Sequence, residues 1–132
     1  MSFEIKDKTA PKEGIKISPF RKNIRKTNPH KHNSYFEIVY LTGGKGVHTI
    51  DMQEFDIAPP ICFVVRKEQV HFWNILSEPE GFVLIIKKAF IDSCLDKEIL
   101  QLVSKISAFP CIYPKQDGIV EQIFQLLMRI KG

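Results

Sequence analysis

The chain has 132 residues and a mass of 15.3 kDa, and 44% of its residues are hydrophobic, which is enough for one compact domain. Its formal net charge of +4 arises from a basic stretch between residues 21 and 31, which lacks the interleaved aromatic residues of a single-strand nucleic-acid binder. The three cysteines form no C-x-x-C pair, so a disulfide framework is not predicted. The sequence has no apolar leader and no apolar run near the ~20 residues of a membrane helix, so we expect a soluble, cytoplasmic protein. The basic stretch by itself does not predict direct DNA contact.

The first 88 residues predict an arm followed by a β-domain. Residues 1–14 are charged and show no hydrophobic period, so we expect a flexible N-terminal arm. Short β-branched and aromatic stretches follow at 15–17, 35–41, 47–51, 54–57, 61–65, 71–76 and 82–87. We interpret the glycine-rich segment 43–46 as a hairpin turn between two of them. Strands at this spacing indicate a mainly β fold, a small antiparallel sandwich or barrel over residues 15–88.

The pattern changes to a helical one over residues 89–132. Apolar residues recur at three and four residues, as on one face of a helix; they are Phe90, Ile91, Cys94, Leu95, Ile99, Leu102, Val103 and Ile106. A last helix is predicted to begin at Asp117 as N-cap, with an apolar face formed by Ile119, Ile123, Leu126 and Ile130. Such a face either packs on the protein's own sheet or forms the seam of a homodimer, because coiled coils use the same spacing.

Four potential metal ligands lie in the strand-forming part. His30 and His32 are two residues apart, so on an extended strand both side chains point to one face. Glu37 lies on the next predicted strand, and His71 begins a later one. If that face is the inside of a barrel, the four side chains converge, and imidazole with carboxylate suits iron, nickel, manganese, copper or zinc.

These residues resemble a known family. His30-x-His32-x4-Glu37, the glycines that follow and the later His71 are similar to the two motifs of the cupin superfamily. The stretches PHKHNSYFEIVYLTGGKGVHTIDMQEFDI, FVVRKEQVHFWNI and EGFVLIIKKAFI resemble the N-terminal sensor and dimerisation domain of AraC-type transcription regulators. The chain departs from cupins before His71, where Lys67 and Glu68 stand in place of a glycine-containing turn.

The resemblance implies a cupin-like barrel, a double-stranded β-helix or jelly roll, followed by C-terminal helices. Its interior would bind a small-molecule effector such as a sugar, the arm would close over it, and the helices would form a homodimer. DNA would be bound by a helix-turn-helix module that is absent from this chain, so we expect the chain to be the sensor domain by itself.

Several residues keep two interpretations. His30, His32, Glu37 and His71 either hold a divalent metal or, without a cofactor, hydrogen-bond to neighbours, effector or water. Trp73 shares strand parity with His71 and either stacks on an effector or belongs to the core. Arg66, in the turn before His71, either binds a polar effector or is solvated. His48 is interpreted as structural.

Two functions follow from these interpretations. The first is effector sensing and dimerisation for a transcription regulator, in which effector binding shifts the arm or the helices and no catalytic group is needed. The second is a small metal-dependent cupin enzyme, such as a dioxygenase or isomerase. The four donors favour the enzyme; the missing turn glycines, the lack of a separate base and the apolar terminal helix favour the sensor.

Overall fold

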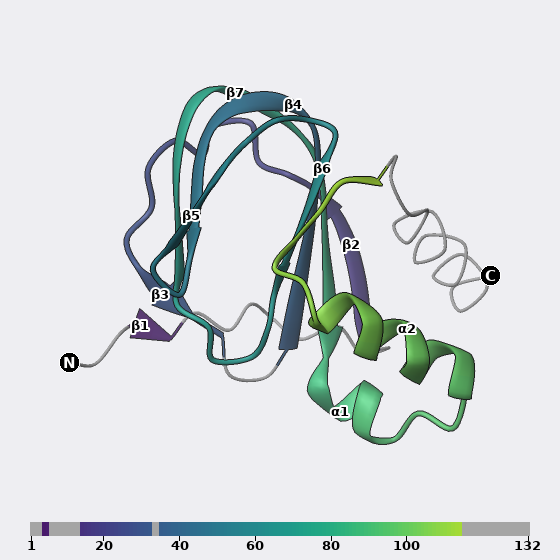
Figure 1. Cartoon of the computed structure of the whole chain (residues 1–132). Helices are drawn as coiled ribbons and strands as arrows, with labels where there is room; N and C mark the ends of the chain where they lie inside the picture. The colour runs from purple at the N-terminus through teal and green to yellow at the C-terminus, as the bar shows by residue number, and fades with distance from the viewer. Residues whose placement is uncertain (1–3, 6–13, 33–34, 115–132) are drawn as a thin grey trace.

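Two long strands organise the molecule. In the computed structural model, which describes residues 4–5, 14–32 and 35–114, β4 (Tyr35–Ile50) and β7 (His71–Lys87) pair antiparallel along most of their length. Both strands arch over together near their middles (Figure 1). The sheet is thereby folded into two layers, and the mainly β, antiparallel fold predicted from the sequence is confirmed.

The glycine-rich segment lies at this bend. Gly43 pairs with Glu80 and Gly46 with Ile75, and the register shifts between Leu41 and Gly46 mark β-bulges. The prediction of a hairpin turn at 43–46 is therefore wrong, because this segment continues β4 opposite an equally continuous β7. Bulges and turns both favour glycine, so the sequence pattern alone does not separate them.

Each layer uses one half of each long strand. The first layer contains β2 (Ile15–Pro19), the end of β7, the start of β4, β6 (Ile61–Val65) and β8 (Cys111–Ile112). The second contains β1 (Glu4–Ile5), β3 (His30–Lys31), the start of β7, the end of β4 and β5 (Gln53–Asp56). The segment 1–14 that we expect to be an arm is otherwise described only at Gly14.

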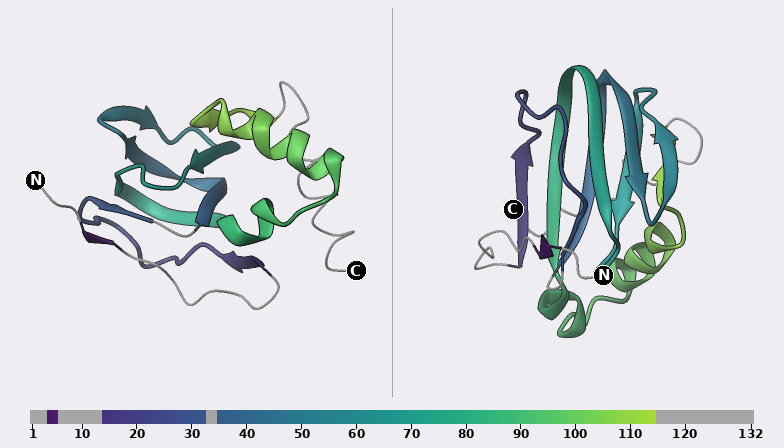
Figure 2. Two further views of the ribbon diagram at one scale, coloured as in Figure 1. Left: turned by 90° about the horizontal axis from the view of Figure 1, so that it is seen from below. Right: turned by 90° about the vertical axis from the view of Figure 1, so that its left-hand side faces the viewer.

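The helical pattern after Lys87 is confirmed as α1 (Lys88–Asp92) and α2 (Lys97–Ser107). Both helices lie at one end of the long strands (Figure 2). The expected helix from Asp117 and its apolar residues Ile119, Ile123, Leu126 and Ile130 lie outside the described residues. Neither of the helices described is long and apolar enough to cross a membrane.

Strand alternation produces two apolar clusters on opposite faces of the first layer. In the parts of β4, β6 and β7 that form this layer, residues of odd number, such as Val39, Phe63 and Ile85, belong to the inner cluster between the layers. Their neighbours of even number, such as Ile38 and Leu84, belong to an outer cluster, against which Phe90 and Ile91 of α1 pack. All five residues of β6 are buried because both of its faces are covered.

The turn before His71 contains no glycine. Glu68 has a φ of 67°, in the left-handed region that glycine adopts most readily. Gln69 stabilises this turn, because its N–H donates to the carbonyl of Arg66 at 3.1 Å and its Oε1 accepts from the Arg66 N–H at 2.7 Å. His71 is thereby placed at the start of β7 as expected.

Candidate functional site

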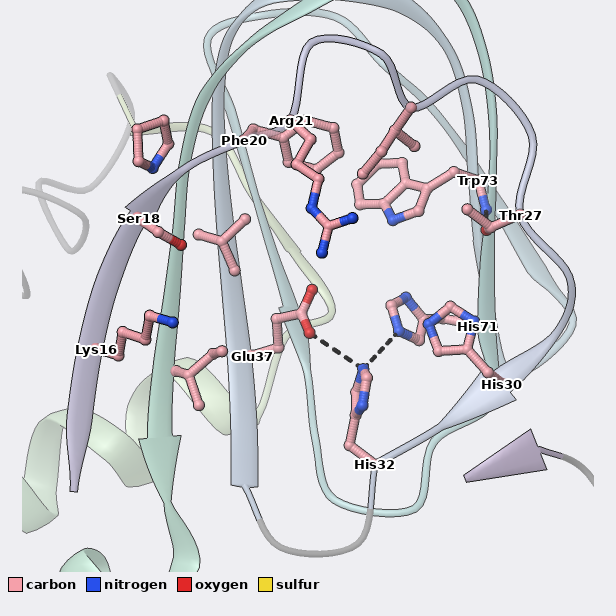
Figure 3. Close-up of a pocket in the computed structure, with 14 residues that line it drawn as sticks. Lys16, Ser18, Phe20, Arg21, Thr27, His30, His32, Glu37, His71 and Trp73 are labelled. Atoms are coloured by element: carbon pink, nitrogen blue, oxygen red, sulfur yellow. Dashed lines mark hydrogen bonds and ion pairs between the residues drawn. The ribbon is translucent and has the colours of Figure 1, made fainter. Parts of the chain in front are cut away.

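A cavity of about 510 Å³ opens between β2, the loop 20–27 and the inner face of the folded sheet (Figure 3). This volume lies within the range of ~300–1,000 Å³ that is usual for sites of small organic ligands. Its lining is formed by Lys16, Ser18, Pro19, Phe20, Arg21, Ile24, Thr27, His30, His32, Glu37, His71, Trp73, Val83 and Ile85.

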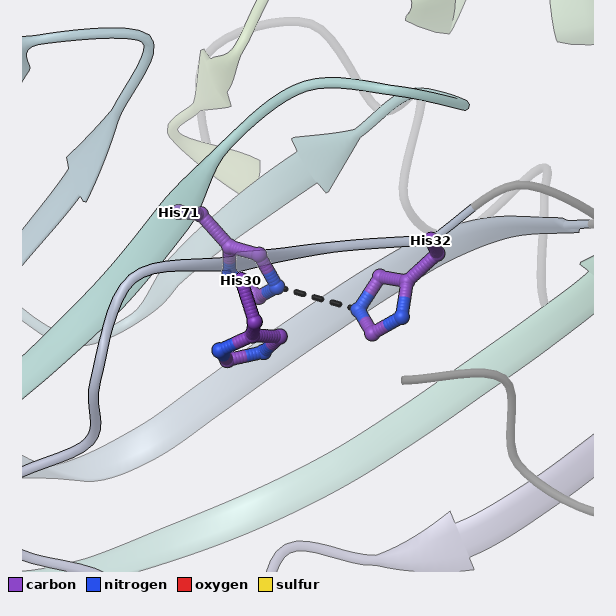
Figure 4. A group of neighbouring side chains, drawn as sticks. All are labelled: His30, His32 and His71. Carbon is purple, nitrogen blue, oxygen red and sulfur yellow. Dashed lines mark hydrogen bonds between the residues drawn. The ribbon is translucent and has the colours of Figure 1, made fainter. Parts of the chain in front are cut away.

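Three histidines meet at one side of this cavity (Figure 4). His30 of β3 pairs directly with His71 of β7, and their ring centroids are 4.4 Å apart. His32 lies two residues further along, and one ring nitrogen from each of the three lies within 4.8 Å of the others. All three side chains are buried, at 7% exposure or less. The convergence follows from the i, i+2 spacing and from the β3–β7 register.

His32 is the hub of a buried polar network. Its Nε2 lies 3.0 Å from Nε2 of His71 and 3.1 Å from Oε2 of Glu37, while its Nδ1 lies 2.8 Å from the hydroxyl of Tyr35. If Nε2 of His32 and Nε2 of His71 were both unprotonated and the Glu37 carboxylate were ionised, the lone pairs of these three atoms would face one another. A proton or a metal cation must therefore lie among these atoms.

Neighbouring groups set the direction of the other two rings. The Nδ1 of His30 donates to the carbonyl oxygen of Asn28 at 2.8 Å, so in a neutral ring its Nε2 carries no proton. The Nδ1 of His71 lies 2.9 Å from Nε2 of His48. Burial, together with the neighbouring His71, lowers the pKa of His48 well below its usual value, so this ring is neutral at pH 7.

The single proton of His48 has two possible positions. If the proton is on Nε2 of His48, it is donated to Nδ1 of His71. A neutral His71 then carries its proton on Nε2 and donates it to Nε2 of His32. If the proton is on Nδ1 of His48, Nε2 of His48 accepts a hydrogen bond from Nδ1 of His71. The Nε2 of a neutral His71 is then unprotonated and can bind an ion. The same residues thus support either a metal-free chain of hydrogen bonds or a set of metal ligands.

The donor set fits a divalent transition metal. Two ligand atoms bound ~2.1 Å from one ion at right angles are ~3.0 Å apart, close to the separations around Nε2 of His32. Glu37 is not part of the group within 4.8 Å, although it contacts His32. A metal would therefore be held by His30, His32 and His71, with Glu37 beside His32.

Trp73 lines the cavity and also belongs to the inner core. Its side chain is 4% exposed, and one face of its ring stacks on His48 at a centroid distance of 3.5 Å and an interplanar angle of 5°. The β4–β7 register places these two residues opposite each other. Recognising His48 as a site residue requires that register, which the sequence pattern does not supply.

Arg66 does not join the cavity lining, because it lies exposed at the 66–69 turn. Two other cations line it instead, Lys16 from β2 and Arg21 from the following loop. The sequence contained a signal for the position of Lys16, because Lys16 and Ser18 alternate with Ile15 and Ile17, which are buried or half-buried on the other face of the strand. Arg21 follows the strand, and its position depends on the loop conformation.

The family model of the AraC-like ligand binding domain matches residues 21–131. A search of curated proteins found no match. Among the solved structures that match is a cupin protein from Bacteroides fragilis, with 20% sequence identity and a TM-score of 0.43. The match covers 56% of this chain and 64% of that one, so it spans less than two thirds of that protein. The residues of the family match include every cavity residue from Arg21 onward.

Proposed function

Because the chain belongs to the family of AraC-like ligand binding domains, we propose that it senses a small metabolite for a transcription regulator acting in the cytoplasm. The metabolite binds in the cavity, and DNA is bound by a separate helix-turn-helix module of the regulator. The observation that carries the proposal is a cavity of about 510 Å³ whose inner side holds buried polar groups at fixed positions. Such groups orient a ligand and discriminate between ligands.

Dimerisation is the second part of this proposal. We expect the apolar face of Ile119, Ile123, Leu126 and Ile130 to pair with the same face of another copy, since its spacing suits a helix seam. Effector binding would then act by favouring one of two arrangements of the dimer, in proportion to its difference in affinity for the two.

Filling the cavity is expected to abolish effector binding. Ser18 is half-buried and points into the cavity (Figure 3), so the indole of a Ser18→Trp variant would occupy the space of a ligand. A thermal-shift screen of small polar metabolites, followed by calorimetric titration of each hit, provides the ligand. We expect Ser18→Trp to weaken the hit by at least about 100-fold, or about 2.7 kcal/mol.

The matched control is Ser104→Trp, which adds the same side chain at an exposed position of α2. It should bind the hit as the unaltered chain does. Equal affinity in all three proteins would show that the ligand binds elsewhere and would contradict the proposed role of the cavity.

A metal-dependent enzyme is the second candidate, and the convergence of three imidazole nitrogens favours it. His30, His32 and His71 would hold the ion, which would supply Lewis acidity toward a substrate oxygen. The carbonyl oxygen of Asn28 would orient the ring of His30, and Nε2 of His48 would orient the ring of His71, each by contact with the Nδ1 of that ligand. Glu37 would accept a proton or complete the ligand set from its place beside His32.

Metal content separates the two candidates. For the enzyme we expect about one equivalent of a transition metal per chain by inductively coupled plasma mass spectrometry, lost in His30→Ala. Glu37→Gln keeps the shape of the side chain and should retain most of the ion if three imidazoles are sufficient. A metal that stays in His30→Ala would contradict this ligand set, and effector binding that survives removal of all metal would favour the sensor alone.

A further inference from the structure

We propose that the effector is an acid, a hydroxylated small molecule with a carboxylate or phosphate group, and that Arg21 and Lys16 bind this group. The inference deepens the proposed function and rests on it, since it names the chemical class that the cavity binds. Sugar acids and sugar phosphates belong to this class.

Both cations point into the cavity. Figure 3 shows the guanidinium of Arg21 directed into the middle of the cavity, above the carboxylate of Glu37, and the ammonium of Lys16 directed inward from the side opposite His30 and His71. Neither side chain has an ion pair or hydrogen bond with any residue that the structure describes. Both are exposed, so they are available to a ligand that enters.

The loop that carries Arg21 is held in place by other residues. The N–H of Phe20 donates to the carbonyl of Gly81 at 2.9 Å, and the Phe20 ring packs edgewise on Trp73 at 5.3 Å. Further along, Arg25 donates to the carbonyls of Lys22 and Ile24 at 2.8 and 3.0 Å. A fixed backbone reduces the entropy lost when Arg21 binds a ligand.

The balance of charge at the cavity favours an anion. Apart from the histidines, its lining contains two cations, Lys16 and Arg21, and one carboxylate, Glu37, which leaves one positive charge in excess. Glu37 is buried, and its Oε2 is engaged with Nε2 of His32 at 3.1 Å. A cationic ligand would meet two like charges, whereas an anion would supply a partner that neither side chain has among the described residues.

The chemistry of the two sides defines the class further. The planar guanidinium of Arg21 presents paired N–H donors that match a carboxylate or phosphate. The imidazoles of the lining can donate to or accept from hydroxyl groups, and Val83 and Ile85 add apolar surface to it. A compound with an acidic group at one end and hydroxyls at the other satisfies both sides.

The test uses matched sets of five- and six-carbon sugars in neutral, carboxylate, phosphate and amino forms, titrated calorimetrically into the unaltered chain. We expect one acidic form to bind at least about 10-fold more tightly than its neutral and amino counterparts. Comparison of the carboxylate and phosphate forms identifies the anion. Affinity for the acid should fall as salt rises, because the mouth is exposed to solvent.

Two variants locate the effect. Arg21→Gln is expected to weaken the acid by about 10-fold or more and its neutral form by less than about 3-fold. Lys22→Gln removes an exposed charge beside it that does not line the cavity, and should leave both affinities unchanged.

The possible failures are distinguishable. A neutral sugar that binds as tightly as its acid, or an acid whose affinity Arg21→Gln does not change, overturns the acidic class. In the first case, weakening of that neutral sugar by Ser18→Trp leaves the sensor function intact. Failure of every sugar to bind also overturns the present inference, while a hit of another class from the metabolite screen keeps the proposed function.

Discussion

Replacing Gly81 by alanine is expected to lower the free energy of unfolding by more than about 4 kcal/mol, enough to unfold much of the protein. Gly81 lies in β7 at the bend, with a φ of 157°. A Cβ at this position would overlap the carbonyl oxygen of Tyr40 and lie 2.9 Å from the Cα of Leu41. Both are backbone atoms of the paired strand, so relief requires separation of β4 from β7.

The matched control for this variant is Gly43→Ala, at the same bend but on β4. Its Cβ would meet the Glu80 side chain at 3.5 Å, an ordinary contact, and we expect a change within about 1 kcal/mol. Urea unfolding followed by circular dichroism gives both values. If both variants lost the same free energy of unfolding, the close approach of residue 81 to the backbone of Tyr40 and Leu41 would not be the cause of the destabilisation.

Replacing Trp73 by alanine is expected to lower the free energy of unfolding by about 3–5 kcal/mol. The indole belongs to the inner core, stacks on His48 and meets the rings of Phe20 and Phe63 edgewise at 5.3 and 5.7 Å. Its removal would leave a cavity and deprive a fully buried imidazole of its stacking partner. Denaturant titration measures the loss, and a variant as stable as the unaltered chain would contradict the packing role.

The same variant bears on effector binding. Loss of binding in Trp73→Ala would follow from damage to the core even if the indole never touches the effector. Trp73→Phe keeps an aromatic ring on His48 and should retain more of the stability. Binding that is lost in Trp73→Phe while its stability is largely kept would support direct contact between Trp73 and the effector.

Local patterns predicted much of the fold. The change from strand to helix periodicity after Lys87 is confirmed, because it depends on residues close together in sequence. The bend at residues 43–46 and the two-residue strand β8 were not predicted. β8 pairs with Cys62 and Phe63 of β6, and this tertiary pairing has no counterpart in local alternation.

The site shows the same division. Strand parity predicted that His30 and His32 share a face, since their side chains are two residues apart. His71 was included as the first residue of a later strand, and its position beside His30 depends on the β3–β7 pairing. The placement of His48 against Trp73 depends on the long register of β4 with β7, and that of Arg21 on a loop held by contacts to β7. Both are set by pairings between segments distant in the chain.

Strand β7 runs without interruption from His71, at the cavity, to Lys87, where α1 begins. The two ends are therefore joined by one hydrogen-bonded ribbon and not by a flexible connection. Because β7 pairs with β4 along most of this length, a shift of His71 along the strand axis would be transmitted toward Lys87 through paired backbone. The three register shifts between Leu41 and Gly46, where β4 pairs with residues 75–81 of β7, interrupt the regular pairing, so this is the place where the paired strands would flex.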